Sequence, residues 1–186
     1  MIIGFVGKMG SGKDEAYKQL AKRLNVTQRT FAKALKEMVQ RAWKISDEDM
    51  KNKPPYVRSL LQIVGTELLR SQVSDRFWID RWELEQCKAD KERILSNITH
   101  VAITDVRFIN EAEFVSDHGG IVIRIERPEG NTVDDSASIE QKKHASEMEL
   151  ESIVENYTIV NDSTPEDLGD NVVTAVTDWL AQDEVP

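Results

Sequence analysis

The N-terminal stretch constrains the fold of this chain more than any other part of the sequence. Ile2 to Val6 is a short apolar run with β-branched and aromatic members, which is typical of a strand buried on both faces. Three closely spaced glycines follow, and glycine permits backbone angles that a side chain would forbid: Gly7, Gly10 and Gly12. From Ala16 to Leu24 the apolar residues recur at helical spacing. The stretch therefore predicts a strand, a glycine loop and a helix in direct succession.

The glycine loop matches a phosphate-binding pattern. Gly7 to Asp14 reads GKMGSGKD, which fits G-x-x-x-x-G-K and then places Asp14 where serine or threonine is expected. Successive backbone N–H groups and the N-terminus of the following helix would form an anion site. Lys13 would reach the β- and γ-phosphates of a nucleoside triphosphate. The plain alternative is a glycine-rich turn that binds nothing, which the flanking strand and helix disfavour.

Asp14 is the departure from this pattern. The usual hydroxyl at that position ligates Mg²⁺, and a carboxylate is also a hard oxygen ligand. Asp14 therefore either replaces the hydroxyl as a metal ligand or only caps the helix, and the sequence leaves both interpretations open.

Composition limits the classes of partner. The chain has 186 residues, which predicts one domain, and a formal net charge of −9, which argues against a nucleic-acid-binding protein. The single cysteine, Cys87, excludes an internal disulfide. We find neither a signal peptide nor an apolar run long enough to span a membrane, so we expect a soluble cytoplasmic protein without a membrane partner.

Strand-like and helix-like segments alternate along the rest of the chain. Further strands are predicted over residues 27–31, 99–104, 121–127 and 156–161. This alternation predicts an α/β fold with a mainly parallel, five-stranded sheet, in which ligands bind beyond the carboxyl ends of the strands. Gly7, Asp105 and Arg127 all fall at such ends, so we expect them to converge. Asp105 would hold Mg²⁺ or only receive loop N–H groups, and the two interpretations are evenly balanced.

The remaining segments are predicted as helices and connections. Helices are expected over residues 31–43, 56–70 and 77–88, from Asn110 as an N-cap to His118, and from Thr164 onward. In the 56–70 helix, the apolar face would comprise Val57, Leu61, Val64 and Leu68. Residues 46–53 are polar and acidic and predict a turn or mobile connection. Pro128 to Lys143 is too long for a plain connection, which makes it a lid candidate or a disordered segment.

Several motifs, in this order, resemble one family. They are GSGKD in the loop, LQIVGTELLR (Leu61 to Arg70), ITDVRFINEAEF (Ile103 to Phe114), GGIVIRIERP (Gly119 to Pro128), HASE (His144 to Glu147) and TIVND (Thr158 to Asp162). Together they resemble the bacteriophage-type deoxynucleoside monophosphate kinases, which belong to the phosphate-loop kinases. The resemblance covers nearly the whole chain, and it implies a P-loop NTPase-like three-layer fold with a helical acceptor-binding region at about residues 32–90 and a lid at about 128–146.

The resemblance also implies an activity and a set of site residues. The family transfers the γ-phosphate of ATP to a deoxynucleoside monophosphate, with Mg²⁺, and its pattern usually reads GKDT, where this chain has Glu15 in place of the threonine. ATP would be held by Gly10, Ser11, Gly12, Lys13 and Asp14, with Asn161 near the base. The acceptor pocket would contain Lys36, Arg58, Gln62, Glu67 and Arg70. Arg107, Arg124 and Arg127 would contact the phosphates during transfer, while His144 and Glu147 would lie near the lid or the acceptor.

Two other functions compete with this interpretation. One is another small-molecule kinase on the same fold, such as a dephospho-coenzyme A kinase, because GSGKD is shared with such enzymes. The other is an ATP-binding protein without turnover, in which Asp14 and Glu15 repel ATP-Mg²⁺. The accepted bases, the choice between deoxy- and ribonucleotides, and the state as monomer or homodimer are left open by the sequence.

Overall fold

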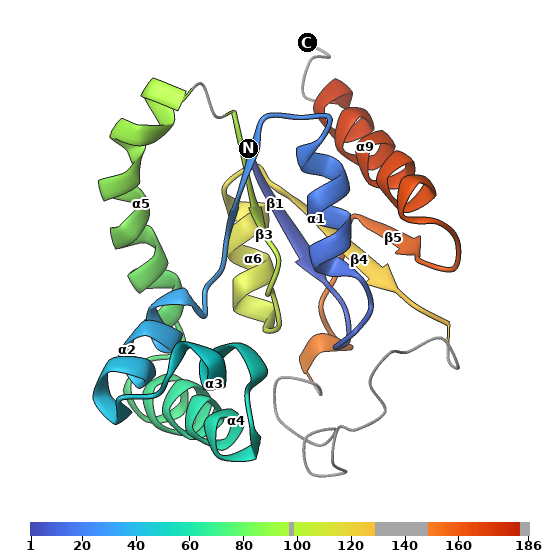
Figure 1. Ribbon diagram of the computed structural model, residues 1–186. Helices are drawn as coiled ribbons and strands as arrows, with labels where there is room; N and C mark the ends of the chain where they lie inside the picture. The colour runs from blue at the N-terminus through green and yellow to red at the C-terminus, as the bar shows by residue number, and fades with distance from the viewer. Residues whose placement is uncertain (97–98, 129–148, 183–186) are drawn as a thin grey trace. The chain divides into compact units, whose positions relative to one another are not determined.

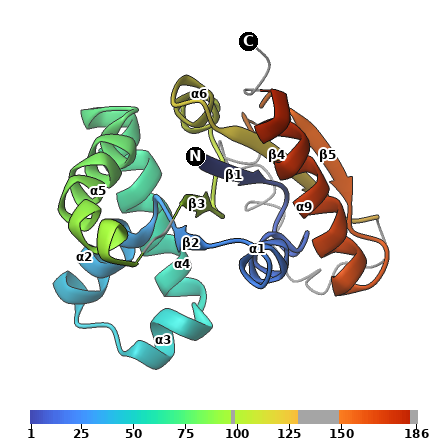
Figure 2. The ribbon, with the colours of Figure 1, turned by 90° about the horizontal axis from the view of Figure 1, so that it is seen from above.

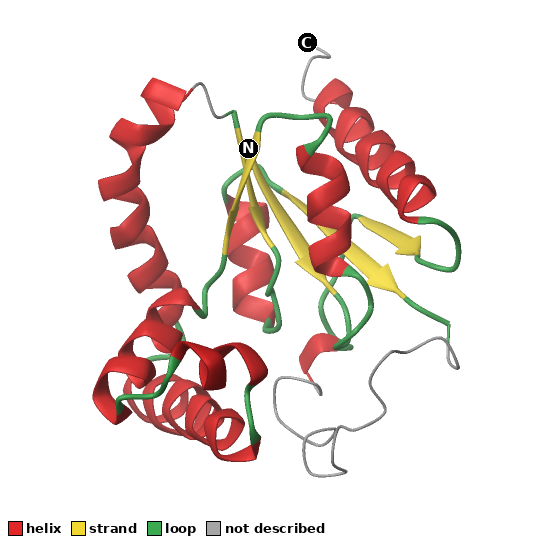
Figure 3. Ribbon diagram, in the orientation of Figure 1, coloured by secondary structure: helices red, strands yellow, loops and turns green. Residues whose placement is uncertain are grey.

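The computed structural model describes residues 1–96, 99–128 and 149–182 (Figure 1). Five strands form one sheet in the order β2-β3-β1-β4-β5, and all four pairings are parallel (Figure 3). The strands are β1 (Ile2–Val6), β2 (Val26–Arg29), β3 (His100–Ile103), β4 (Ile121–Glu126) and β5 (Tyr157–Val160). The predicted α/β fold with a parallel five-stranded sheet is confirmed.

Helices cover both faces of this sheet. Helices α1 (Lys13–Ala21) and α9 (Pro165–Gln182) pack on one face, and α6 (Ile109–Asp117) packs on the other (Figure 2). Alternate residues of the central strands face α1 and α9, and Ile3, Phe5 and Ile123 are completely buried among them. Burial on both faces explains why β1 and β4 are continuous apolar runs in the sequence.

The chain forms two compact units. One comprises Met1–Arg29 and Arg93–Pro186, and contains the sheet; the other comprises Thr30–Glu92. The second unit contains α2 (Lys33–Trp43), α3 (Asp47–Asn52), α4 (Pro55–Gln62), the π-helix η1 (Ile63–Val73) and most of α5 (Phe77–Ser96). The helical region predicted at about residues 32–90 therefore lies within the second unit.

The second unit has its own buried contacts. Trp78 and Trp82 are buried, and the indole Nε1 of Trp78 donates a hydrogen bond to the carbonyl oxygen of Gly65 at 2.9 Å. A Cβ atom at Gly65 would lie 2.5 Å from Cδ2 of Leu35, so α2 and η1 pack too closely for a larger residue there. Gly65, the glycine of the LQIVGTELLR segment, thus has a packing role.

Two local predictions were wrong. The segment 46–53 contains helix α3 (Asp47–Asn52) instead of a turn, because the Ser46 hydroxyl accepts a hydrogen bond from the Asp49 N–H at 3.1 Å and acidic residues occupy the first turn. Helix α6 begins at Ile109, not after Asn110. Its start is stabilised by the Glu111 carboxylate, which accepts from the N–H groups of Arg107 at 2.8 Å and Phe108 at 3.2 Å.

The predicted 56–70 helix is two helices of different type. Helix α4 ends at Gln62, and η1 continues as a π-helix to Val73, with i→i−5 bonds such as Ser74 N–H to the Leu69 carbonyl. The longer turn changes which residues face inward. Val57 and Val64 are buried as predicted, whereas Leu68 is 46% exposed and Arg70 only 8% exposed. The helical spacing used for the prediction does not apply to η1.

Other boundaries follow the predicted signals. Helix α6 ends before Gly119, which has a positive φ of 65°. Helix α9 begins after Thr164, whose hydroxyl accepts from the Asp167 N–H at 3.2 Å. Pro128 aside, the lid candidate lies outside the described residues. Within the part of the chain that the structure describes, no helix is long and apolar enough to span a membrane.

Candidate active site

The glycine loop joins β1 to α1 and has the backbone expected of an anion site. Gly12 is the N-cap of α1, with φ 106° and ψ 15°, and no side chain in the described part of the chain caps this helix end. The N–H groups of the first turn of α1 therefore remain available to a ligand. A Cβ atom at Gly12 would overlap Nδ2 of Asn161, and one at Gly7 would overlap the carbonyl oxygen of Ile125. Only glycine fits at both positions.

Lys13 lies over this loop. Its ammonium Nζ donates hydrogen bonds to the carbonyl oxygens of Gly7 at 2.5 Å and Lys8 at 2.8 Å. The positive charge is thus held beside the loop backbone, where a bound phosphate would be a stronger acceptor than a carbonyl. This position suits the phosphate contact that the motif predicts.

Asn161 directly follows β5 and contacts the glycine loop. Its side-chain Nδ2 donates to the carbonyl oxygen of Ser11 at 2.9 Å, and its backbone N–H donates to the Glu126 carbonyl at 2.7 Å. The side chain is buried, with 9% exposed. The family resemblance implies that Asn161 lies near the ATP base. Its contacts favour a different role, in which Asn161 holds the phosphate loop in position.

Two buried polar groups beside the loop have no hydrogen-bond partner among the described residues. They are the Ser11 hydroxyl oxygen and the Nε of Arg127. Arg127 lies directly after β4, and its Nη1 is 3.5 Å from the carbonyl oxygen of Gly10, at the limit of hydrogen bonding. Buried polar groups are normally satisfied, so an unsatisfied hydroxyl and an unsatisfied guanidinium nitrogen beside one loop suit an anionic ligand with several acceptor oxygens.

A residue that the sequence analysis missed connects the loop to the neighbouring strands. Gln28, near the end of β2, donates from Nε2 to Asp14 Oδ1 at 3.1 Å and to Thr104 Oγ1 at 2.8 Å. Thr104 is buried and follows β3. The sequence offers little signal for Gln28, because the predicted strand of residues 27–31 places it near the start, whereas β2 ends at Arg29 and brings it near the carboxyl end, where ligands of such sheets bind.

The carboxylates near this network fit a magnesium ion. Asp14 begins α1, and Asp105 is half-buried beside Thr104. The described residues contain no group of three or more acidic, histidine or cysteine side chains that could hold a metal alone. Mg²⁺ is commonly bound by one or two carboxylates together with substrate phosphates and water. The donor set is therefore suited to Mg²⁺ held jointly with a nucleotide.

Arg124 occupies a different environment from Arg127. Its Nη2 donates to the carbonyl oxygens of Leu150 at 3.2 Å and Ile153 at 2.8 Å, and to Glu155 Oε2 at 2.9 Å. The hydrogen bond from Arg124 lowers the pKa of the Glu155 carboxyl below its usual range. These contacts favour a structural role for Arg124. Arg107 is half-buried, with its backbone N–H on Glu111.

The residues predicted to bind the acceptor lie in the second unit. Arg58 is half-buried and donates from Nε to the Lys53 carbonyl at 2.8 Å. Arg70 is buried in η1 and Glu67 is exposed, while Lys36 and Gln62 are half-buried. His144 and Glu147 lie outside the described residues. The structure thus collects five predicted acceptor residues in one helical unit.

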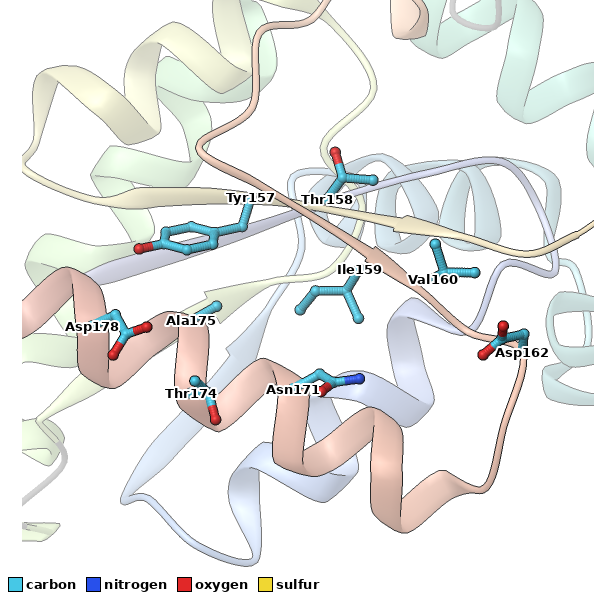
Figure 4. A pocket seen from close by; sticks show the side chains of 9 residues that line it. All are labelled: Tyr157, Thr158, Ile159, Val160, Asp162, Asn171, Thr174, Ala175 and Asp178. Carbon is cyan, nitrogen blue, oxygen red and sulfur yellow. The ribbon is translucent and has the colours of Figure 1, made fainter.

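A shallow groove lies elsewhere in the first unit, between the edge strand β5 and α9 (Figure 4). Its volume is about 410 Å³, and it is lined by residues including Tyr157, Thr158, Asn171 and Asp178. The TIVND segment contributes Thr158 and Asp162 to its lining, but none of the individual site residues predicted from the sequence lines it. The candidate site is therefore the phosphate loop and not this groove.

All five strands contribute to the candidate site at their carboxyl ends. β1 leads into the glycine loop, and the other strands carry or precede Gln28, Thr104, Arg127 and Asn161 respectively. Hydrogen bonds join three of these four residues to the loop or to Asp14. Gly7, Asp105 and Arg127, which the sequence predicts to converge, each follow the carboxyl end of one of three neighbouring strands, β1, β3 and β4.

Comparison with known proteins agrees with this geometry. The sequence profile of the family described as "Deoxynucleotide monophosphate kinase" matches residues 45–172. A protein of Acanthamoeba polyphaga mimivirus, named "Putative deoxynucleotide monophosphate kinase", is 31% identical over 95% of this chain and 96% of its own length. Among solved structures, shikimate kinase from Aquifex aeolicus vf5 matches with a TM-score of 0.53 and 16% identity over 97% of this chain and 99% of that one, a likeness of fold alone.

The profile match and the phosphate loop are separate observations. The matched residues begin at Ile45, so the glycine loop of residues 7–14 lies outside them, while β3, β4 and β5 lie inside. The mimivirus relative spans both parts. The chain therefore belongs to the deoxynucleotide monophosphate kinase family, a family of nucleotide-directed phosphotransferases.

Proposed function

We propose that this protein transfers the γ-phosphate of ATP to a deoxynucleoside monophosphate, giving the diphosphate, with Mg²⁺. The observation that carries the proposal is the phosphate loop, with Lys13 bonded to its backbone and with two buried donors, on Ser11 and Arg127, that have no partner among the described residues. A loop of this kind suits the β- and γ-phosphates of a nucleoside triphosphate. Membership of the family supports the monophosphate as acceptor.

Each group near the loop has a distinct role in this proposal. The N–H groups at the start of α1 hold the phosphates, and Lys13 moves from the loop carbonyls to phosphate oxygens. The guanidinium of Arg127, through its Nε, neutralises negative charge on the phosphoryl group that is being transferred. Mg²⁺, when bound by Asp14 and Asp105 together with the nucleotide, would neutralise charge on the donor phosphates.

The acceptor needs no general base. A nucleoside monophosphate is already an anionic nucleophile, so the protein has only to position it and offset the charge. We assign this positioning to the second unit, through Arg58, Gln62 and Arg70 with Lys36 and Glu67. Arginine guanidinium groups pair with phosphate oxygens bidentately, whereas glutamine and glutamate can bond a base edge. Arg107 is assigned to the phosphates by family resemblance alone.

A coupled assay with ATP and Mg²⁺ tests the proposal. Each common deoxy- and ribonucleoside monophosphate is offered in turn, along with dephospho-coenzyme A, and ADP formation is followed. We expect turnover with one or more deoxynucleoside monophosphates and none with Lys13→Ala, measured on protein with a wild-type circular dichroism spectrum. Turnover with dephospho-coenzyme A alone would assign a different kinase. ATP binding without transfer to any acceptor would refute catalysis.

A further inference from the structure

The side-chain amide of Gln28 makes two hydrogen bonds at the metal side of the proposed site. Its Nε2 lies 3.1 Å from Asp14 Oδ1 and 2.8 Å from Thr104 Oγ1. An ionised carboxylate accepts hydrogen bonds and donates none, so the nitrogen of the amide, and not its oxygen, must face Asp14. The two N–H bonds of one amide nitrogen are then both used, one on each partner.

This arrangement leaves one oxygen of Asp14 available. Among the described residues, only Oδ1 of Asp14 has a hydrogen-bond partner, and Asp14 forms no ion pair there. Gln28 is half-buried, and Thr104, to which it is anchored, is 5% exposed. The amide is therefore fixed from the buried side, and it orients the carboxylate so that Oδ2 is free to bind a cation.

We propose that Gln28 is a positioning residue for the metal, acting through Asp14. The inference rests on the proposed function, because it assumes that Asp14 binds a divalent cation together with a nucleotide. Groups that hold a ligating carboxylate in place typically contribute strongly to metal affinity. The Asp14 side chain has one more rotatable bond than the Ser or Thr that usually occupies this position, so ordering it costs more conformational entropy. The hydrogen bond from Gln28 would offset that cost by holding the carboxylate in one orientation.

A purely structural role for Gln28 makes a different prediction. If the amide only ties β2 to the start of α1, its loss would lower thermal stability and leave cation affinity unchanged. If it positions Asp14, its loss would weaken cation binding, and would do so only while Asp14 is present. Metal affinity and the dependence on Asp14 therefore separate the two roles.

Binding of Mn²⁺ in the presence of a non-hydrolysable ATP analogue provides the test. Free Mn²⁺ is measured by electron paramagnetic resonance for the wild type and for Gln28→Met, an apolar replacement of similar length. We expect Mn²⁺ affinity to fall about tenfold, with metal-free affinity for the analogue unchanged. Gln40→Met is the matched control, because Gln40 also donates to a carboxylate, Asp47 Oδ1 at 2.6 Å, but belongs to the second unit, which contains no residue assigned to the metal. Its Mn²⁺ affinity should equal that of the wild type.

A double-variant cycle completes the test. In an Asp14→Asn background, Gln28→Met should change Mn²⁺ affinity by less than about twofold, because its effect passes through the missing carboxylate. Thr104→Val, which removes the anchor but retains Gln28, should weaken Mn²⁺ binding about threefold, and it provides the same information should Gln28→Met not fold. Equal affinity in wild type, Gln28→Met and Thr104→Val, or effects of Gln28→Met and Asp14→Asn that multiply, would overturn the inference.

The outcome also separates this inference from the proposed function. Wild-type protein that binds Mn²⁺ with the analogue but transfers no phosphate would refute the kinase reaction and leave the role of Gln28 intact. Transfer by the wild type, with Mn²⁺ affinity unaffected by Gln28→Met, would refute the role of Gln28 alone. Failure of the wild type to bind Mn²⁺ with the analogue would refute both.

Discussion

Replacement of Gly12 by alanine should damage the phosphate loop more than the same change at Gly10. Both glycines have positive φ, 106° and 79°. A Cβ atom at Gly10 would have no heavy atom of the described residues within 4 Å, whereas one at Gly12 would overlap Nδ2 of Asn161. Gly10→Ala is therefore a matched control that carries the backbone cost without the steric cost.

The size of the difference follows from the Asn161 contact. An L-residue in the left-handed region costs about 1–2 kcal/mol, and both variants carry this cost. At Gly12 the new methyl group must also displace the Asn161 amide, which breaks its 2.9 Å bond to the Ser11 carbonyl oxygen. An unsatisfied buried carbonyl costs about 1–3 kcal/mol. We expect a loss of unfolding free energy of about 1–2 kcal/mol for Gly10→Ala and about 2–5 kcal/mol for Gly12→Ala.

Urea unfolding followed by far-ultraviolet circular dichroism measures both losses. A third variant, Asn161→Ala, removes the displaced amide, so adding Gly12→Ala to it should cost only the backbone term of about 1–2 kcal/mol. Affinity for an ATP analogue should fall in the same order, because the loop that Asn161 supports carries the phosphate contacts. Equal losses for Gly10→Ala and Gly12→Ala, or strict additivity of Gly12→Ala and Asn161→Ala, would refute this reasoning.

Three further predictions concern other groups. In steady-state kinetics, Arg70→Ala should raise the Michaelis constant for the monophosphate at least about tenfold, equivalent to about 1.4 kcal/mol, and leave the Michaelis constant for ATP nearly unchanged. A rise in the Michaelis constant for ATP alone would contradict the assignment of η1 to the acceptor. Lys13→Ala should nearly abolish transfer with little change in thermal melting, and wild-type turnover would contradict the phosphate contact. Glu155→Gln should cost about 1–2 kcal/mol at neutral pH. Arg124 lowers the pKa of the Glu155 carboxyl in the folded protein, so this stabilisation is present above the unfolded pKa and is lost as pH falls through the folded pKa. The unfolding free energies of variant and wild type, measured by urea titration, should therefore converge at low pH. A difference that stays constant down to acid pH would exclude the ion pair as the source of the stabilisation.

Local sequence patterns determined much of the fold. The apolar runs of β1 and β4, the glycine loop between β1 and α1, and the Thr164 cap of α9 are all contained within a few neighbouring residues. Such features depend on backbone sterics and short-range hydrogen bonds, so they can be recognised without knowledge of the fold. The order of strands and helices then implied a parallel sheet with its ligand site at the carboxyl ends of the strands.

Side-chain partners were decided only by the tertiary structure. Arg124 and Arg127 are three residues apart on one segment, yet Arg124 contacts Leu150, Ile153 and Glu155, whereas Arg127 lies against the phosphate loop. The π-helix that buries Arg70 and exposes Leu68 has no signal in the helical spacing of its apolar residues.

The same holds for the supports of the phosphate loop. Gln28 reaches Thr104 across 76 positions of the chain, and Asn161 reaches Ser11 across 150. Residue type alone could not assign these contacts, because an amide bonds equally well to water, to a ligand or to the backbone. The sequence by itself determined that a phosphate loop is present. Only the packing of five strand ends around that loop decided which side chains hold it in place, since those partners are distant in sequence and become neighbours only when the sheet forms.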